Sequence, residues 1–249
     1  MGRVAHDANK MSVRVPLHGA NLRDGGPWSL DERAAHYLLR VHRLREGDLV
    51  TVFSRDGVEV SARLVAGDPW VLNAQGEPRE GLTAAPVIVC YALPKGDKVD
   101  RVVRQLTELG VERLLLFGGA RSVVKLSPER AKKKLERWDR IASEAARQSG
   151  RADSLIIEGP FTLNEVLERT AAGSQLVFEP SADGTLDRHE WSCPVSLFIG
   201  PEGGFAAEEL AVMSESGVHA VRLGPLVMRT ETAAPVAAAL VLEKIGALS

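Results

Sequence analysis

The sequence IGPEGGF, residues 199–205, places a glycine-rich turn between an apolar stretch, residues 195–199, and a polar segment with helical character from residue 206. Glycine lets a backbone approach a ligand closely, and Pro201 restricts the turn. A strand that runs through such a turn into a helix is typical of open α/β sheets, which bind ligands at the carboxyl ends of their strands. On spacing alone, a tight strand-to-helix turn without a ligand fits equally well.

Apolar runs and helical periodicity alternate on both sides of this turn, from residue 83 to the end of the chain. The apolar runs typical of strands cover residues 87–92, 113–117, 155–158, 175–179, 195–199 and 220–223. Helical periodicity covers residues 98–109, 128–148, 163–171, 206–216 and 232–245. This alternation predicts an α/β domain with a mostly parallel sheet covered by helices on both faces.

The part before residue 83 has a different pattern. Residues 49–65 alternate apolar and polar positions around Asp56-Gly57, a strong hairpin signal, and residues 29–45 have the caps and spacing of one helix. Residues 76–85 are rich in glycine, proline and charge, as linkers are. The sequence therefore predicts a small β-barrel domain over residues 12–82 and an α/β domain over residues 83–249. Residues 1–11 are polar, without the apolar core of a secretory signal.

Composition narrows the class of protein. Of 249 residues, 45% are hydrophobic and 26% are charged, and no apolar run approaches the roughly 18 residues of a membrane span. We expect a soluble, cytoplasmic globular protein. The two cysteines, Cys90 and Cys193, lie in apolar strand-like segments and are expected in the core. The histidines form no ligand-spaced set with them, so no metal site is expected.

Charge is unevenly distributed along the chain. Residues 121–151 carry ten Lys and Arg against four Asp and Glu, whereas residues 152–249 carry five against fourteen. A basic block in a slightly acidic protein indicates a contact with a polyanion, although a solvated helix face would have the same composition.

Two further loops follow strands of the same predicted sheet. They are FEPSA, residues 178–182, and LGPLVMRTETA, residues 223–233. Thr230 or Thr232 would cap the final helix, but a cation such as Arg229 is unfavourable at its positive end. Arg229 is therefore expected to have an anionic partner, either Glu231, Glu202 or a substrate. None of the loops contains the phosphate-loop or G-x-G-x-x-G pattern, which disfavours nucleoside triphosphates and dinucleotides.

IGPEGGF followed by LGP, three residues and RTETA resembles the ribosomal RNA small-subunit methyltransferase E family, a SPOUT class that methylates N3 of a uridine in small-subunit (16S) ribosomal RNA. Four other segments agree in order: HYL with VHRL at 36–44, KGDK with QLTELG at 95–110, RS at 121–122 and EAARQSGR at 144–151. The chain departs from the family at Leu226, where arginine is frequent, at Leu106, where lysine is frequent, and in its opening RVPL, residues 14–17.

The resemblance implies a PUA-like β-barrel domain followed by a SPOUT-type parallel sheet with a C-terminal trefoil knot. It also implies a homodimer that uses S-adenosyl-L-methionine and acts on small-subunit ribosomal RNA or on the assembled small ribosomal subunit. Arg229 is the expected stabiliser of the uracil oxygens, with Glu202 or Glu231 as proton acceptor or as a partner that orients Arg229.

Two residue sets follow from the resemblance. The expected cofactor-binding residues are Leu176, Phe178, Glu179, Pro180, Ile199, Gly200, Pro201, Gly203, Gly204, Leu223, Gly224, Pro225, Val227, Met228 and Thr230. The expected RNA-binding residues are Arg40, Arg43, Lys95, Lys98, Arg121, Lys132, Lys133, Arg137, Gln148 and Arg151. The alternatives are a non-catalytic RNA-binding module, a SPOUT methyltransferase that acts on another RNA nucleotide, and a different nucleotide-binding enzyme on the same kind of sheet.

Overall fold

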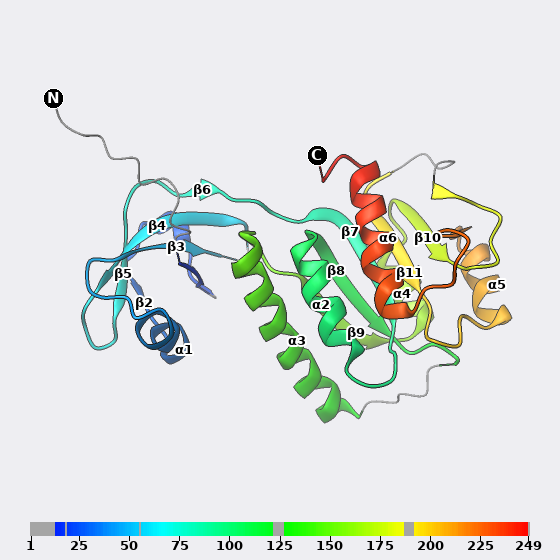
Figure 1. The fold of residues 1–249 in the computed structure, drawn as a ribbon, viewed down its shortest axis with the longest axis horizontal. Helices are drawn as coiled ribbons and strands as arrows, with labels where there is room; N and C mark the ends of the chain where they lie inside the picture. The colour runs from blue at the N-terminus through cyan, green and yellow to red at the C-terminus, as the bar shows by residue number, and fades with distance from the viewer. Residues whose placement is uncertain (1–12, 18, 55, 122–126, 187–191, 249) are drawn as a thin grey trace. The chain divides into compact units, whose positions relative to one another are not determined.

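The computed structural model describes residues 13–17, 19–54, 56–121, 127–186 and 192–248. The chain forms two compact units, Met1–Leu82 with Gly150–Asp153, and Thr83–Ser149 with Ser154–Ser249 (Figure 1). The expected second domain ran without interruption from residue 83. In the structure Gly150–Asp153 belongs to the first unit instead, where the Ala152 N–H donates to the Leu82 carbonyl at 2.7 Å.

The first unit is built on a six-stranded sheet in the order β1-β3-β4-β5-β2, with β6 paired to β4. Its strands are β1 (Arg14–Pro16), β2 (Trp28–Ser29), β3 (Leu49–Phe53), β4 (Val58–Val65), β5 (Val71–Ala74) and β6 (Arg79–Glu80). Only the β1–β3 pair is parallel. The expected hairpin joins β3 to β4, with Gly57 in the left-handed region at φ 81°. Within the described residues the pairings run along one sheet, from β1 at one edge to β2 at the other.

The helix of the first unit is shorter than the periodicity predicts. A short 3₁₀ turn, η1 (Leu22–Asp24), precedes α1 (Glu32–His36), which is capped by the Asp31 carboxylate and continues as a π-helical turn, η2 (Tyr37–Val41). Leu38 is buried in the core of this unit, and the Leu44 N–H donates to its carbonyl at 3.0 Å. The predicted helix therefore ends at Val41, and the apolar Leu44 beyond it lies in a segment that is hydrogen-bonded back to Leu38.

The second unit contains a six-stranded, wholly parallel sheet in the order β12-β10-β11-β7-β8-β9. Its strands are β7 (Ala85–Ala92), β8 (Val111–Phe117), β9 (Ile156–Phe161), β10 (Ser174–Phe178), β11 (Val195–Ile199) and β12 (His219–Val221). The predicted α/β class and parallel sheet are confirmed. The trefoil knot stays a prediction.

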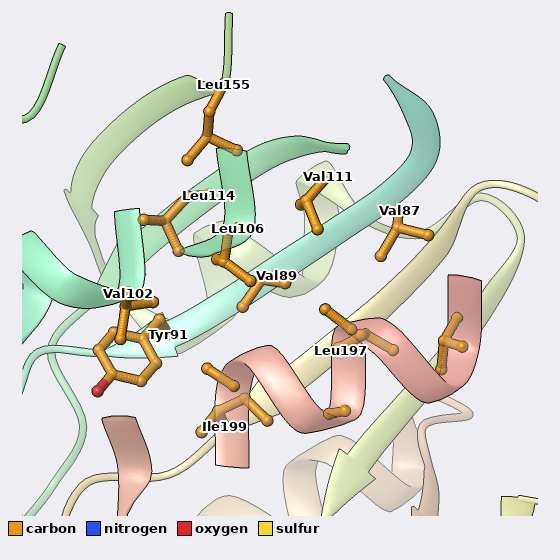
Figure 2. Packing of buried hydrophobic residues seen from close by; sticks show 14 of the residues in the cluster. Val87, Val89, Tyr91, Val102, Leu106, Val111, Leu114, Leu155, Leu197 and Ile199 are labelled. Carbon is orange, nitrogen blue, oxygen red and sulfur yellow. The ribbon is translucent and has the colours of Figure 1, made fainter. Parts of the chain in front are cut away.

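Helices cover both faces of this sheet (Figure 1). Alternate side chains of a strand point to opposite faces, so Tyr91 packs with α2 (Lys98–Glu108), α3 (Pro128–Ser149) and α6 (Thr230–Lys244), as Figure 2 shows in part. Its neighbour Cys90 packs with α4 (Leu163–Arg169) and α5 (Ala207–Glu215) on the other face.

Helix ends in the second unit mostly follow the local sequence signals. Ser127 accepts hydrogen bonds from the first turn of α3, and Gly110 follows α2 in the left-handed region at φ 83°, the residue types that favour these two positions. The cap of α6 differs, because Arg229 occupies the N-cap position and Thr230 is the first helical residue. Cys193 is exposed rather than buried, since the strand begins only at Val195.

Candidate active site

The carboxyl ends of β12, β10 and β11 are adjacent, and the loops that follow them enclose a cavity of about 360 Å³. This edge of the sheet is where the sequence predicts the ligand. The predicted cofactor residues that line the cavity are Phe178, Glu179, Pro180, Ile199, Gly200, Pro201, Gly204, Leu223, Gly224, Val227, Met228 and Thr230. Glu202 and Arg229, both expected to be catalytic, line it as well. The three loops of the sequence prediction therefore share one cavity.

Three predicted cofactor residues do not line the cavity. Leu176 is buried inside β10, Gly203 is exposed and its carbonyl accepts a 2.8 Å hydrogen bond from Arg121 Nη1, and Pro225 is exposed. Sequence reasoning missed Phe205, Leu226 and Ala233, which do line it. Phe205 is the last residue of the glycine-rich motif, and the motif itself was the available signal for it.

Glycines shape the wall of this cavity. A Cβ atom on Gly200 would lie 3.1 Å from the Phe205 ring, and Gly204 and Gly224 have φ values of 68° and 146° that disfavour other residues. The loops are also tied together, since the Glu179 N–H donates to the Val221 carbonyl at 3.0 Å. A largely apolar hollow of this volume with a few polar groups is typical of cofactor sites. The residues present fit a nucleoside-containing cofactor held by backbone groups.

Lys98, at the start of α2, links the two carboxylates of the site. Its Nζ lies 2.7 Å from Glu202 Oε1 and 3.4 Å from Glu231 Oε2. Burial raises the pKa of the Glu202 carboxyl, but the hydrogen bond from Lys98 and its charge, with backbone N–H groups, bring it below the usual value. The pKa of Glu231 is lowered first by a backbone hydrogen bond and then by Lys98, against the effect of burial. The pKa of Lys98 itself is raised, chiefly by its hydrogen bond to Glu202. Both carboxylates are therefore kept ionised.

Arg229 is the third residue that the sequence predicts to be catalytic. Its backbone carbonyl accepts from the N–H groups of Thr232 and Ala233 at 2.8 Å, whereas its exposed side chain, which lines the cavity, makes no hydrogen bond or ion pair within the described residues. Neither Glu202 nor Glu231 forms a hydrogen bond or ion pair with it in this part of the chain, but the charge of Arg229 helps to lower the pKa of Glu231. That one of them orients Arg229 stays a prediction. Of the three anionic partners considered, Glu231 and the substrate both remain.

A buried hydrogen bond supports the floor of the site. The hydroxyl of Tyr91, on β7, lies 2.9 Å from Thr230 Oγ1, which in turn lies 3.4 Å from Glu231 Oε2. Burial raises the pKa of Tyr91 far above its usual value, so the phenol stays neutral. Tyr91 was missed from the sequence, because a tyrosine in an apolar strand gives no sign of its partner 139 positions away.

The predicted RNA-binding residues fall into three groups. Arg40, Arg43, Lys95, Arg121, Lys132, Lys133, Arg137 and Gln148 are exposed. Lys98 forms ion pairs with Glu202 and Glu231 beside the cavity. Arg151 is only 5% exposed and its Nε donates to Asp153 at 2.6 Å, so its assignment to an RNA-binding surface is corrected to a structural one within the first unit. Ser122 of the RS motif lies outside the described residues.

Among the residues that the structure describes, no group of three or more His, Cys, Asp or Glu side chains is placed to hold a metal ion. No helix in this part of the chain is long and apolar enough to cross a membrane.

Known proteins with similar sequences and structures share this architecture. Residues 82–242 match the RNA methyltransferase domain family and residues 30–69 the RNA methyltransferase PUA domain. The chain is 33% identical over 236 residues to ribosomal RNA small subunit methyltransferase E of Bacillus subtilis, which covers 88% of this chain and 91% of the relative.

Two solved structures extend the likeness to the whole fold. A Legionella pneumophila protein described as a methyltransferase in complex with the bound cofactor SAM has 28% identity, a TM-score of 0.85 and coverage of 94% of this chain and 98% of its own. The ribosomal RNA small subunit methyltransferase E of Neisseria gonorrhoeae, bound to S-adenosyl methionine, has 25% identity, a TM-score of 0.83 and the same coverage. This chain belongs to the ribosomal RNA small subunit methyltransferase E family.

Proposed function

We propose that this protein transfers the methyl group of S-adenosyl-L-methionine to N3 of a uridine in small-subunit (16S) ribosomal RNA. The observation that carries the proposal is the cavity formed by three strand-end loops. Arg229 lines it, and within the described residues its side chain makes no hydrogen bond or ion pair. The names of the relatives, and the cofactor bound in two similar structures, support methylation of small-subunit ribosomal RNA with S-adenosylmethionine. The uridine N3 target rests on the family resemblance of the sequence motifs.

When bound, the cofactor supplies an electrophilic methyl group on a sulfonium. The loops would hold it through backbone groups, with Gly200 and Gly204 allowing close approach and Phe178 providing apolar contact. Such a site accelerates transfer by keeping the methyl carbon in line with the acceptor nitrogen and by excluding water.

Uracil N3 carries a proton and becomes a good nucleophile only when that proton leaves. Arg229 would donate hydrogen bonds to a uracil oxygen and stabilise the developing negative charge. Glu202, which lines the cavity and is ionised, would take the proton directly or through water. The N3–CH3 bond forms as the C–S bond breaks, the proton ends on the carboxylate, and the neutral thioether leaves. Lys98 would keep Glu202 and Glu231 in place.

The substrate would be ribosomal RNA or the assembled small subunit, with the target base presented unpaired or extruded. Purified protein with labelled S-adenosylmethionine should therefore produce 3-methyluridine in unmodified 16S RNA or in small subunits from a deletion strain, as detected by mass spectrometry of nucleosides. A different methylated nucleoside would identify another RNA methyltransferase. RNA binding without any methyl transfer would favour the non-catalytic module.

The active species would be a homodimer. Helix α6 buries Ala234, Ala237 and Ala238 within its own chain, but Leu226 and Val227 are each 79% exposed and Leu240 is 40% exposed. Apolar side chains left in solvent at and beside a ligand cavity favour a partner surface. A second copy of the chain is the partner that the family resemblance implies.

A further inference from the structure

A second hollow in the methyltransferase unit lies outside the active site. It is an open groove of about 490 Å³ between α2 and α3, lined by Asp100, Arg104, Arg137, Arg140, Ile141 and Glu144. Figure 1 shows these two helices side by side along one face of the sheet. Three arginines that line one hollow repel one another. What the groove can bind therefore depends on which of these arginines are already paired with a carboxylate.

Each acidic side chain of the groove already has a cationic partner. Asp100 accepts hydrogen bonds from Arg137 and, at 3.0 Å, from the indole N–H of the buried Trp138. Glu144 forms an ion pair with Arg147, one turn further along α3. The carboxylates are therefore not the partners of the two remaining arginines.

Arg104 and Arg140 reach the groove from opposite helices. Arg104 is exposed on α2 and makes no hydrogen bond or ion pair among the residues that the structure describes. Arg140 donates only its Nε, to the Glu136 carbonyl at 3.3 Å, so its two Nη groups are available. Two guanidinium groups that converge on one hollow match the fork geometry by which arginine binds phosphate.

Helix α2 contributes to both the active site and the groove, from different sides of the helix. Lys98, which contacts Glu202 at the cavity, and Arg104 are six residues apart on this helix, which is about 9 Å along its axis at 1.5 Å per residue. Six residues also turn the helix by about 600°, so the two side chains leave it about 120° apart.

We propose that Arg104 and Arg140 bind a backbone phosphate of the RNA substrate in the α2–α3 groove, outside the active site. This site rests on the proposed function. It adds Arg104 and Arg140 to the residues expected from the sequence, and it assigns Arg137 to holding Asp100 rather than to RNA. A contact of this kind fixes the position of the strand without reading its sequence.

The test compares Arg104→Gln and Arg140→Gln with Arg169→Gln, which removes one exposed charge from α4 on the other face of the sheet. Binding to a 16S RNA transcript is measured against salt concentration, and cofactor binding is measured by calorimetry. Each groove variant should bind the transcript about tenfold more weakly. Its log–log salt slope should fall by about 0.7, the value for one lost phosphate contact on a single strand.

The kinetic readouts separate a positioning contact from a folding defect. We expect the RNA KM of the groove variants to rise while kcat at saturating RNA and the cofactor affinity stay at wild-type values. RNA binding and salt slopes equal to those of Arg169→Gln would overturn the inference. A wild-type protein that binds the transcript but never methylates RNA would overturn the proposed function. The comparison of RNA binding would still test whether Arg104 and Arg140 contact the RNA.

Discussion

Lys98 Nζ lies 2.7 Å from Glu202 Oε1, an ion pair between residues 104 positions apart in the chain. It joins the first turn of α2 to the glycine-rich loop after β11, and the same ammonium group reaches Glu231 on α6. The proposed proton acceptor is thus held by a residue of another helix, whose charge favours the ionised form.

Removing this charge should alter the pH dependence of the reaction. In Lys98→Met the pKa of Glu202 should rise, because burial would no longer be opposed by a cation. The reaction needs ionised Glu202, so the acidic limb of the kcat profile should move to higher pH while rates converge at alkaline pH. Lys98→Arg keeps the charge and should retain the wild-type profile. An equal loss of kcat at every pH would contradict the proposal that Lys98 lowers the pKa of Glu202.

Arg229 should be required for chemistry more than for binding. Arg229→Ala should reduce methyl transfer by about a hundredfold or more, the scale for loss of one group that stabilises transition-state charge, with cofactor affinity nearly unchanged. Arg222→Ala, an exposed arginine that does not line the cavity, is the matched control. Loss of cofactor binding in Arg229→Ala would instead give Arg229 a structural role.

The two glycines at positions 200 and 203 should differ in their tolerance of a side chain. Gly200→Val would place Cβ 3.1 Å from the Phe205 ring and push it into the cavity, so calorimetry should show much weaker S-adenosylmethionine binding. Gly203→Val meets only Arg121, at 3.6 Å, and should bind normally. This reverses the expectation from the motif, in which Gly203 was a cofactor residue. An equal loss of S-adenosylmethionine affinity in both variants would support Gly203 as a cofactor residue after all.

The Tyr91–Thr230 hydrogen bond should contribute to stability. Thr230→Val would leave the buried Tyr91 hydroxyl without its partner, which costs about 1–3 kcal/mol in the free energy of unfolding. For a protein of this size each 1 kcal/mol lowers Tm by about 2–4 °C in thermal denaturation. Thr230→Ser keeps the hydroxyl and should melt close to wild type. A wild-type Tm for Thr230→Val would mean that the bond is energetically neutral.

Dimer formation should depend on the exposed side of α6. Leu240→Arg places a charge on a side chain that is 40% exposed, and should lower both dimer content and activity in light scattering and methylation assays. Ala238 is fully buried in its own chain, so Ala238→Arg should unfold the protein rather than separate subunits. An active wild-type monomer of about 27 kDa at micromolar concentration would overturn the proposed dimer.

Local signals in the sequence were sufficient for most of the fold. Apolar runs locate the parallel strands because those strands are buried on both faces. Gly57 marks the hairpin of the first unit, and Gly110 and Ser127 mark the end of α2 and the start of α3. The three loops of the candidate site follow from their position after β10, β11 and β12. Such features depend on residues that are close together in the chain.

Features that depend on distant residues could not be predicted. No spacing rule pairs Lys98 with Glu202 or Tyr91 with Thr230, since each pair forms only after the sheet has assembled. The same limit explains the misassignment of Arg151, whose burial results from packing in the first unit. Cys193 was misplaced because an apolar neighbourhood does not show that the strand starts two residues later.

The membership of Gly150–Asp153 in the first unit has a consequence for biosynthesis. Ribosomes make the chain from the N-terminus, so the first unit lacks this segment until about 70 residues beyond Leu82 have been added. At about 5–20 residues per second the delay is about 4–14 s. During that interval the Leu82 carbonyl has no Ala152 N–H to accept from, and Gly81 lacks the close approach of Ala152. The N-terminal unit therefore reaches its final packing only after α3 has been synthesised.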